Sequence, residues 1–393
     1  GNVAIGYQAL DGTAANEHEG TIAIGYQALT GVVTGAGNTT VGYKSLNLLT
    51  SGAQNTIMGY EAGKDIRSGS SNNTAFGYAS LGQTGSSVAG DGNTCIGSLS
   101  GQNIGTGGDS NHNTLVGYNS GNDITTGDYN VAIGSNAGYK ITTGINNVIM
   151  GRAAGQNTLD GDNNTLLGFG AGSGVLTTAD DGTTAIGHLA GYAVAAGTHG
   201  TASAANREPN TLIGSSAGTA LTVGDGNVAV GAFALDAEVT GHKTTAVGFN
   251  ALTEQVNGSD VDVYNTAVGY KAGDAITVGV QNVFIGSESD GAYSTNNQIA
   301  IGHTTTVGGQ YGIAIGHNVT AGGNDCVIGK NGTGNYITVD FDADADWDYS
   351  SDSRMKRNIQ DDTLGLSFIN DLKTKTFQWK SSEEFPEEWE NYT

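Results

Sequence analysis

The sequence predicts an all-β fold in which short repeated coils stack into a parallel β-solenoid. Three observations carry this prediction. A motif of the type NVAIG recurs along most of the chain, its commonest spacing is 17 residues, and the 393 residues include 65 Gly but only 2 Pro. Self-similarity at a short period is typical of stacked-coil proteins. The glycines lack the every-third spacing of collagen, and so few prolines exclude a proline-rich disordered chain.

The central glycine of the motif marks each coil. We expect about nineteen coils in residues 1–331, centred on Gly6, Gly25, Gly42, Gly59, Gly77, Gly97, Gly117, Gly134, Gly151, Gly168, Gly187, Gly214, Gly231, Gly248, Gly269, Gly286, Gly302, Gly316 and Gly329. Parallel strands lie about 4.8 Å apart, so the predicted rod is roughly 85 to 90 Å long. The longest interval contains an insertion from His188 to Gly214. Because loops absorb insertions, it is our candidate for a lateral contact loop.

The residues before each glycine predict strands that are apolar on two faces. The residue directly before it is apolar in every copy, and the residue two places earlier is β-branched in all but one. The residue between them is polar only at Thr40. Half-exposed strands alternate apolar and polar residues, so these strands should be buried on both faces. A single roll has only one interior, which can bury only one of the two faces of each strand. We therefore expect identical chains around a common axis, in a homotrimeric fibre.

An asparagine opens most copies, and its side-chain amide is expected to hydrogen-bond along the stack and to cap the tight turn. Aromatic residues often follow the glycine, at Tyr7, Tyr26, Tyr43, Tyr60, Tyr78, Tyr118, Phe169, Phe249 and Tyr270. These rings either form a stripe on which sugar rings of a host glycan stack, or stack on each other along the fibre. We favour the second interpretation.

The sequence does not indicate a cofactor or a metal site. His303 and His317 share one position in consecutive coils, which leaves a metal site between chains as a minor alternative. Alternating acids lack the spacing of an EF-hand and are interpreted as a solvated connector: Asp340, Asp342, Asp344, Asp346 and Asp348. The GDGN, GDNN and GDYN segments are explained by turn chemistry. Cys95 and Cys326 have no partner at metal-ligand spacing.

The charge and hydropathy of the chain exclude two classes of partner. With 38 Asp and Glu against 15 Lys and Arg, the formal net charge is −23, which repels nucleic acid. No apolar stretch approaches the roughly 20 residues that span a bilayer, so membrane insertion is not expected. The chain begins at Gly1 inside the repeat pattern, and we interpret it as a segment of a longer product.

The repeat unit, as in NVAIGYQAL and NTLVGYNSG, resembles the left-handed parallel β-roll head of trimeric autotransporter adhesins. The resemblance covers residues 1 to about 331. It implies a left-handed roll and a trimer.

The repeat stops near Tyr336, and the composition then changes. We assign residues 332–351 to an acidic connector and 352–393 to the first part of a small α+β domain, with a helix in DDTLGLSFINDLK and a strand in TKTFQWK. SSDSRMKRNI and LGLSFINDLKTKTFQWK resemble the self-cleaving intramolecular chaperone of endosialidase-type phage tailspikes and tail fibres. The resemblance implies cleavage between Ser351 and Asp352, with Ser351 as nucleophile and Lys356 as base. A lysine serves as a base where burial depresses its pKa.

These observations favour a structural and receptor-binding segment of a phage tail fibre. The expected location is extracellular, in the tail fibre of the virion. Its expected partners are two further copies, a host cell-surface glycan or protein, and other virion tail proteins. Two alternatives stay open: a bacterial trimeric surface adhesin and a polysaccharide-degrading tailspike. No recurring acid pair or Ser/His/Asp set indicates an enzyme in the shaft. The only chemistry expected is single-turnover self-cleavage.

Overall fold

The computed structural model describes residues 1–12, 19–32, 34–82, 90–174, 181–194, 208–330, 335–342 and 348–349. The chain divides into two compact units, Gly1–Tyr349 and Ser350–Thr393. The second unit lies outside the described residues. The predicted helix and strand near the C-terminus therefore remain predictions.

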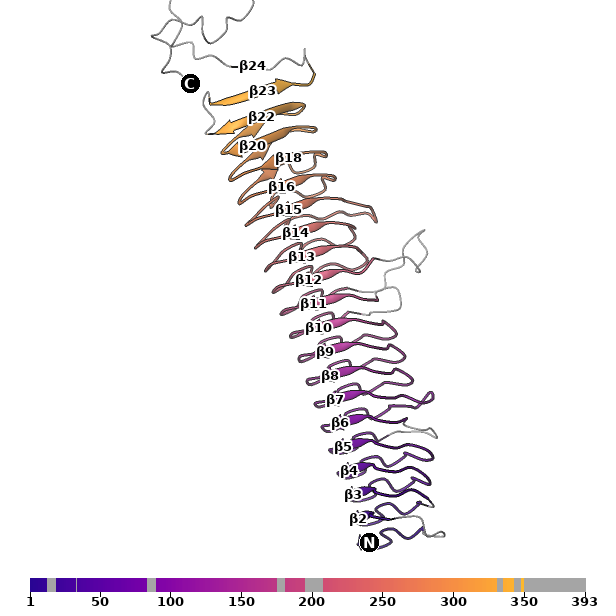
Figure 1. The fold of residues 1–393 in the computed structure, drawn as a ribbon. Helices are drawn as coiled ribbons and strands as arrows, with labels where there is room; N and C mark the ends of the chain where they lie inside the picture. The colour runs from indigo at the N-terminus through magenta and orange to yellow at the C-terminus, as the bar shows by residue number, and fades with distance from the viewer. Residues whose placement is uncertain are drawn as a thin grey trace, which may run out of the picture. The chain divides into compact units, whose positions relative to one another are not determined.

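The first unit is a stack of coils that each contribute a short strand to one long parallel sheet (Figure 1). No helix occurs among the described residues. The predicted all-β parallel solenoid is confirmed, whereas the coil number, the handedness and the trimer remain predictions. The main-sheet strands are β1 Val3–Ile5, β2 Ile22–Ile24, β3 Thr39–Val41, β4 Thr56–Met58, β5 Thr74–Phe76, β6 Thr94–Ile96, β7 Thr114–Val116, β8 Val131–Ile133, β9 Val148–Met150, β10 Thr165–Leu167, β11 Thr184–Ile186, β12 Thr211–Ile213, β13 Val228–Val230, β14 Thr245–Val247, β15 Thr266–Val268, β16 Val283–Ile285, β18 Ile299–Ile301, β20 Ile313–His317, β22 Asp325–Lys330, β23 Tyr336–Asp340 and β24 Asp348–Tyr349.

The interior of the solenoid is filled by the middle residue of each three-residue strand from β2 to β18, and by Ala314 in β20 and Val327 in β22, all of which are buried. In the coils centred on Gly6 to Gly269, a second interior position lies four residues after the central glycine, has positive φ and is occupied by either Leu or Gly. Coils with Leu there, such as Leu29 and Leu252, have Ala or Thr at the strand centre. Where this residue is glycine, the strand centre is often larger. A Cβ on Gly121 would lie 2.6 Å from the side chain of Leu115. The two positions therefore fill the same part of the close-packed interior, and a large side chain at one leaves little room for a large side chain at the other.

The predicted asparagine ladder is confirmed. In one example, the side-chain amide of Asn130 donates to the Oδ1 of Asn113 at 3.1 Å and to the carbonyl of Gly144 at 2.8 Å. The backbone N–H of Asn130 donates to the same Oδ1 at 2.9 Å. The amide of Asn130 thus joins the coil before it to the turn after it, and its hydrogen-bonding groups are satisfied although Asn130 is buried.

The central glycines hold the coils at a distance that no side chain permits. Gly151 has φ +133°, and a Cβ at this position would lie 2.3 Å from the carbonyl oxygen of Gly168 in the next coil. The same clash recurs along the stack, for example between Gly231 and Gly248. Glycine is therefore required both for its backbone conformation and for the close approach of successive coils.

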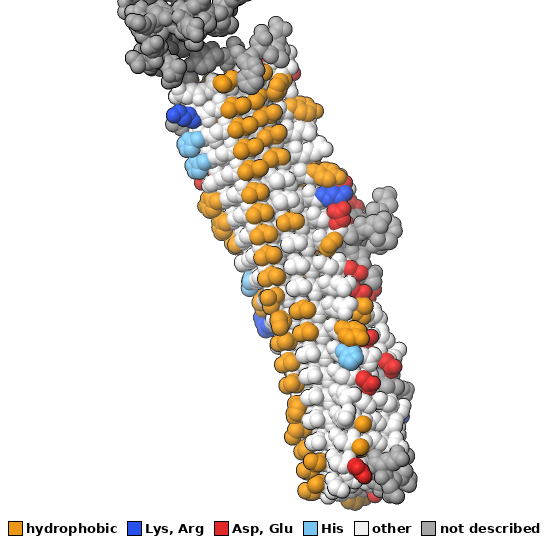
Figure 2. Space-filling view, in the orientation of Figure 1, with side chains coloured by type: hydrophobic (Ala, Val, Ile, Leu, Met, Phe, Trp, Pro, Cys, Tyr) orange, Lys and Arg blue, Asp and Glu red, His pale blue; other side chains and the backbone are white. Residues whose placement is uncertain are grey.

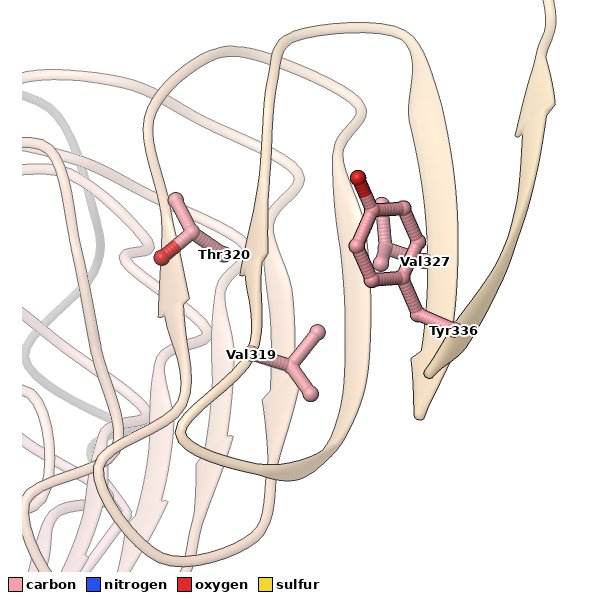
Figure 3. A pocket seen from close by; sticks show the side chains of 4 residues that line it. All are labelled: Val319, Thr320, Val327 and Tyr336. Atoms are coloured by element: carbon pink, nitrogen blue, oxygen red, sulfur yellow. The ribbon is translucent and has the colours of Figure 1, made fainter. Parts of the chain in front are cut away.

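The parallel ladder ends at β22, which pairs with β23 in the antiparallel direction, and β23 then pairs with β24. Part of the region predicted as a connector is thus strand. A second, three-stranded sheet of β17 (Asp290–Gly291), β19 (Thr306–Val307) and β21 (Thr320–Ala321) forms on another side of the last coils. A pocket of about 160 Å³ is lined by Val319, Thr320, Val327 and Tyr336, and Figure 3 shows these four side chains. The Tyr336 ring packs against the end of the core.

Candidate functional site

The principal surface feature of the shaft is an apolar stripe, which we define as the residues directly before the central glycines, from Ile5 in β1 to Ile328 in β22. These side chains face away from the interior, and none is buried. Each pairs with its counterpart in the next coil, as Ile5 does with Ile24 and Ile24 with Val41. The stripe consists of Ile5, Ile24, Val41, Met58, Phe76, Ile96, Val116, Ile133, Met150, Leu167, Ile186, Ile213, Val230, Val247, Val268, Ile285, Ile301, Ile315 and Ile328.

The apolar stripe follows from the pleat of the strands. Successive side chains of a strand point to opposite faces, so the central residue enters the core and its two neighbours point outward. Several outward residues are well exposed, including Ile5 at 57% and Leu167 at 43%. Figure 2 shows hydrophobic side chains following one another along this face. No stripe residue, and no residue two places before one, is Asp, Glu, Lys or Arg. A continuous apolar patch of this length marks an interaction surface.

The aromatic residues after the glycines form a column of stacked rings. Successive centroids from Tyr7 through Tyr26, Tyr43 and Tyr60 to Tyr78 are 5.3, 5.3, 4.9 and 5.7 Å apart, with interplanar angles of 11° to 16°. The favoured interpretation, rings stacking on each other along the fibre, is confirmed for this part. Sugars bind to the faces of aromatic rings, and between these tyrosines the faces are already occupied by other rings. The column is therefore a poor glycan platform.

His303 and His317 also stack, with ring centroids 5.3 Å apart and planes 11° apart. A metal ion binds the lone pair of a ring nitrogen, which lies in the ring plane. Because these two planes are nearly parallel, their lone pairs do not converge on one ion. No group of three or more potential ligands from His, Cys, Asp and Glu gathers in the part of the chain that the structure describes.

The acidic turn residues make hydrogen bonds to the preceding coil. In the GDYN and GDNN turns, Asp128 accepts from the backbone N–H of Asn111 at 2.6 Å, and Asp162 accepts from that of Ile145 at 2.7 Å. Asp342 accepts from the side-chain amide of Asn324 at 2.6 Å. These contacts join successive coils, so they are not hydrogen bonds within a turn, and the turn-chemistry interpretation does not describe them. Asp344 and Asp346 lie outside the described residues.

Sequence reasoning missed a polar cluster inside the solenoid. Glu238 is fully buried, and its Oε1 accepts from the backbone N–H groups of Val239, Thr240 and Gly241 at 2.8 to 3.1 Å. Its Oε2 accepts from the Gln255 amide at 2.8 Å. The sequence did contain a signal for this cluster. Glu238 and Gln255 both lie seven positions after a central glycine, and at this position other coils have buried aliphatic residues such as Ile66, Ile104, Ile124 and Ile141.

A second missed feature is a carboxyl pair on consecutive coils. Asp290 accepts from the backbone N–H of Gly291 at 2.8 Å and from that of Ala275 at 3.2 Å. Burial raises the pKa of Asp290 to about 7, and the nearby carboxyl of Asp274 acts in the same direction, whereas the two backbone hydrogen bonds oppose the shift. The pair therefore retains a proton under mildly acidic conditions.

Asp290→Asn is expected to stabilise the shaft above pH 7. The folded chain keeps the Asp290 proton up to about pH 7, whereas an unfolded aspartate releases it near pH 4, about its ordinary pKa. Folding therefore takes up a proton between these values, and the free energy of unfolding falls as the pH rises from about 4 to 7. The substitution should remove this loss, which amounts to at most about 4 kcal/mol. Urea unfolding at pH 5 and pH 8 measures it.

Asp262→Asn is the matched contrast for that prediction. The hydrogen bond from the Tyr264 hydroxyl, followed by the one from Lys243, lowers the pKa of Asp262. Its contribution to stability is present above the unfolded pKa and is lost as the pH falls through the folded one. Asparagine here should weaken the shaft at neutral pH. The raised pKa of Asp290 would be contradicted if Asp290→Asn and Asp262→Asn changed the free energy of unfolding in the same direction at pH 8.

The predicted catalytic residues Ser351, Asp352 and Lys356 lie outside the described residues, so their mutual geometry remains a prediction. The same holds for residues 195–207 of the insertion predicted as a contact loop.

Comparison with known families bears on this C-terminal segment. Residues 351–391 match the family model described as Chaperone of endosialidase. The resemblance predicted for this segment is thereby confirmed. A β-solenoid followed by a chaperone-of-endosialidase segment indicates a phage tail fibre or tailspike. No curated protein matches the chain. Among the described residues, none forms a helix long and apolar enough to cross a membrane.

Proposed function

We propose that the chain is part of a homotrimeric phage tail fibre whose solenoid shaft projects toward the host. In this proposal the shaft binds a cell-surface glycan or protein and joins other virion tail proteins. The C-terminal domain drives trimerisation and is then released by self-cleavage between Ser351 and Asp352.

The observation that carries the proposal is the apolar stripe. A single chain leaves it partly exposed along the whole stack, and each aliphatic side chain forgoes a fraction of the about 1.5 to 3 kcal/mol that its full burial provides. Three copies that turn this face toward a common axis bury it completely. The family matched at residues 351–391 implies trimeric fibre assembly, which favours three chains over two.

The charge distribution supports the same arrangement. Each chain has a formal net charge of −23, so close packing of several chains requires the acids to lie away from the axis. The apolar stripe has no charged residue. By contrast, Asp128 and Asp162 lie in the turns that precede β8 and β10. The face proposed for contact is thus the one where self-repulsion is weakest.

In the proposed cleavage, Ser351 supplies the nucleophilic hydroxyl and Lys356 the base. The net reaction is hydrolysis of the peptide bond between Ser351 and Asp352, with one water consumed. An unprotonated amine is needed to accept the hydroxyl proton. Assembly of the domain around Lys356 would depress its pKa by burial. Cleavage would then follow correct assembly.

Cleavage is tested by mass spectrometry of the full-length product. We expect a shaft fragment ending at Ser351 and complete loss of this fragment in Ser351→Ala and in Lys356→Ala. Ser350→Ala is the matched control, because it removes the neighbouring hydroxyl and should still be cut. An uncut wild-type chain that assembles normally would contradict the proposal, as would cleavage that persists in Ser351→Ala.

A further inference from the structure

The column of stacked rings is interrupted around Tyr118. The residue after the central glycine is a tyrosine in each coil from Tyr7 to Tyr78, but it is Ser98 in the next coil, then Tyr118, and then Ser135. The Tyr118 side chain is 52% exposed. Within the described part of the chain, its ring stacks on no other ring and has no cation over its face. Both faces of this ring therefore lack the ring neighbours that the other tyrosines have.

The backbone beside the column continues through the interruption in the same register. The N–H of Leu99 donates to the carbonyl of Tyr78 at 2.9 Å, and the N–H of Asn119 donates to the carbonyl of Ser98 at 3.1 Å. The same contact joins the coils that carry the stacked tyrosines. Tyr78, Ser98 and Tyr118 thus occupy equivalent places in successive coils, and only a ring is missing at Ser98.

The spacing of the coils matches the insertion of one ring. Adjacent strands lie about 4.8 Å apart, so two coils place Tyr118 about 10 Å along the stack from Tyr78. The stacked tyrosines are 4.9 to 5.7 Å apart. A ring at the level of Ser98 would therefore keep this same spacing from both tyrosines. We call the levels of Ser98 and Ser135, on the two sides of Tyr118, the open positions of the column.

Polar and uncharged groups accompany the open positions. The hydroxyl groups of Ser98 and Ser135 and the side-chain amide of Asn136 have no hydrogen-bond partner among the described residues, and all three residues are half-buried. The nearest charged residue at the ring position is Arg152, two coils beyond Tyr118, and its guanidinium already lies over the ring of the next coil. A ligand at the open positions would thus meet an aromatic face and neutral hydrogen-bonding groups.

We propose that Tyr118 is a stacking residue for a neutral pyranose sugar, which enters the column at an open position. This inference rests on the proposed function, in which the shaft binds a cell-surface glycan or protein, and it assigns a sugar to this site. The C–H groups on a pyranose face pack against the aromatic ring, and the hydroxyl groups at the sugar edge bond to the serine and asparagine side chains.

Two observations favour this ligand over others. An apolar side chain of a protein partner would cover the hydroxyl groups of Ser98 and Ser135 without bonding to them, which costs free energy. An anionic sugar would be repelled by a chain with a formal net charge of −23. A neutral sugar satisfies the polar groups and avoids the repulsion.

The test is fluorine NMR of the full-length chain labelled with fluorotyrosine. The Tyr118 resonance is identified by its loss in Tyr118→Phe, and the probes are the methyl glycosides of glucose, galactose and mannose. We expect at least one probe to shift the Tyr118 resonance in a saturable manner. The resonance of Tyr43 should not move, because Tyr26 and Tyr60 cover both faces of its ring.

Filling the open positions should remove this response. In a double variant with Ser98→Tyr and Ser135→Tyr, rings of the chain itself would cover both faces of Tyr118, and the shift should be lost completely. The double variant with Ser98→Ala and Ser135→Ala is the matched control, because it leaves both positions open and should keep a saturable shift. The proposal is overturned if no probe shifts the Tyr118 resonance of the wild-type chain, or if the filled variant responds as the wild type does.

Native mass spectrometry of the same sample separates this inference from the proposed function. A trimer whose Tyr118 resonance does not respond to any probe would overturn the sugar site, while the trimeric fibre and a protein receptor would still stand. Monomers whose Tyr118 resonance shifts would support the sugar site and contradict the trimer. If the filled variant does not fold, the wild-type comparison of Tyr118 with Tyr43 decides the case.

Discussion

Gly151→Ala is expected to destabilise the shaft by about 3 kcal/mol or more, the upper range for strained backbone. The methyl group would lie 2.3 Å from the carbonyl oxygen of Gly168. The conflict is with backbone, so a change of rotamer does not relieve it. The backbone would also keep φ +133°, which residues with a Cβ rarely adopt. Urea unfolding, together with hydrogen exchange of the coils around β9 and β10, measures the effect.

Gly258→Ala is the matched control for this substitution. A Cβ on Gly258 has no heavy atom within 4 Å, and no positive φ constrains the residue. Its effect should stay within about 0.5 kcal/mol, as for other surface substitutions. Equal stability of Gly151→Ala and Gly258→Ala would show that the close approach of the coils does not require glycine. A loss confined to Gly151→Ala would show that it does.

Leu167→Glu is expected to convert the proposed trimer into folded monomers. In a single chain this side chain is 43% exposed, so a carboxylate there is solvated and costs little. In the proposed trimer it would bring three carboxylates to the common axis. Each would lose hydration at a cost of several kcal/mol, about 3 or more, and would repel the other two. Native mass spectrometry and analytical ultracentrifugation measure the oligomeric state, and circular dichroism checks the fold.

Gln281→Glu adds the same charge away from the apolar stripe. Gln281 is exposed on a turn before β16, so this variant should remain trimeric. The trimer proposal is wrong if the wild-type chain is a stable monomer at working concentration, or if Leu167→Glu assembles as well as Gln281→Glu. Comparing the two variants separates a local effect of the stripe from a general effect of added charge.

The repetitive part of the fold could be predicted because each signal recurs in many coils. The apolar residue before the glycine, the buried asparagine and the aromatic residue after the glycine each appear at one position, so stacking places equivalent side chains in contact. A periodic signal of this kind identifies the neighbours along the stack. This is why the sequence predicts the asparagine ladder and favours the stacked tyrosine column.

The features that could not be predicted from the sequence depend on contacts that occur only once in the chain. Thr40 was visible as a polar exception, but its buried partner, the hydroxyl of Ser45 at 2.5 Å, follows from the path of one turn. Glu238 finds its partners across coils of unequal length, which the repeat pattern does not align. Strand β23 reverses direction, and nothing in a parallel repeat predicts that reversal. The geometry around Ser351 and Lys356 likewise depends on a domain without repeats.

The exchange of leucine for glycine inside the coils has a consequence for how such a shaft changes during evolution. Each coil contacts only its two neighbours. A large side chain at one interior position is matched by a small one in the same coil or in the adjacent coil. Duplication or loss of a whole coil therefore leaves a well-filled rod of a different length. Recombination between near-identical repeats would adjust the reach of the shaft in steps of one layer, without inventing a new fold.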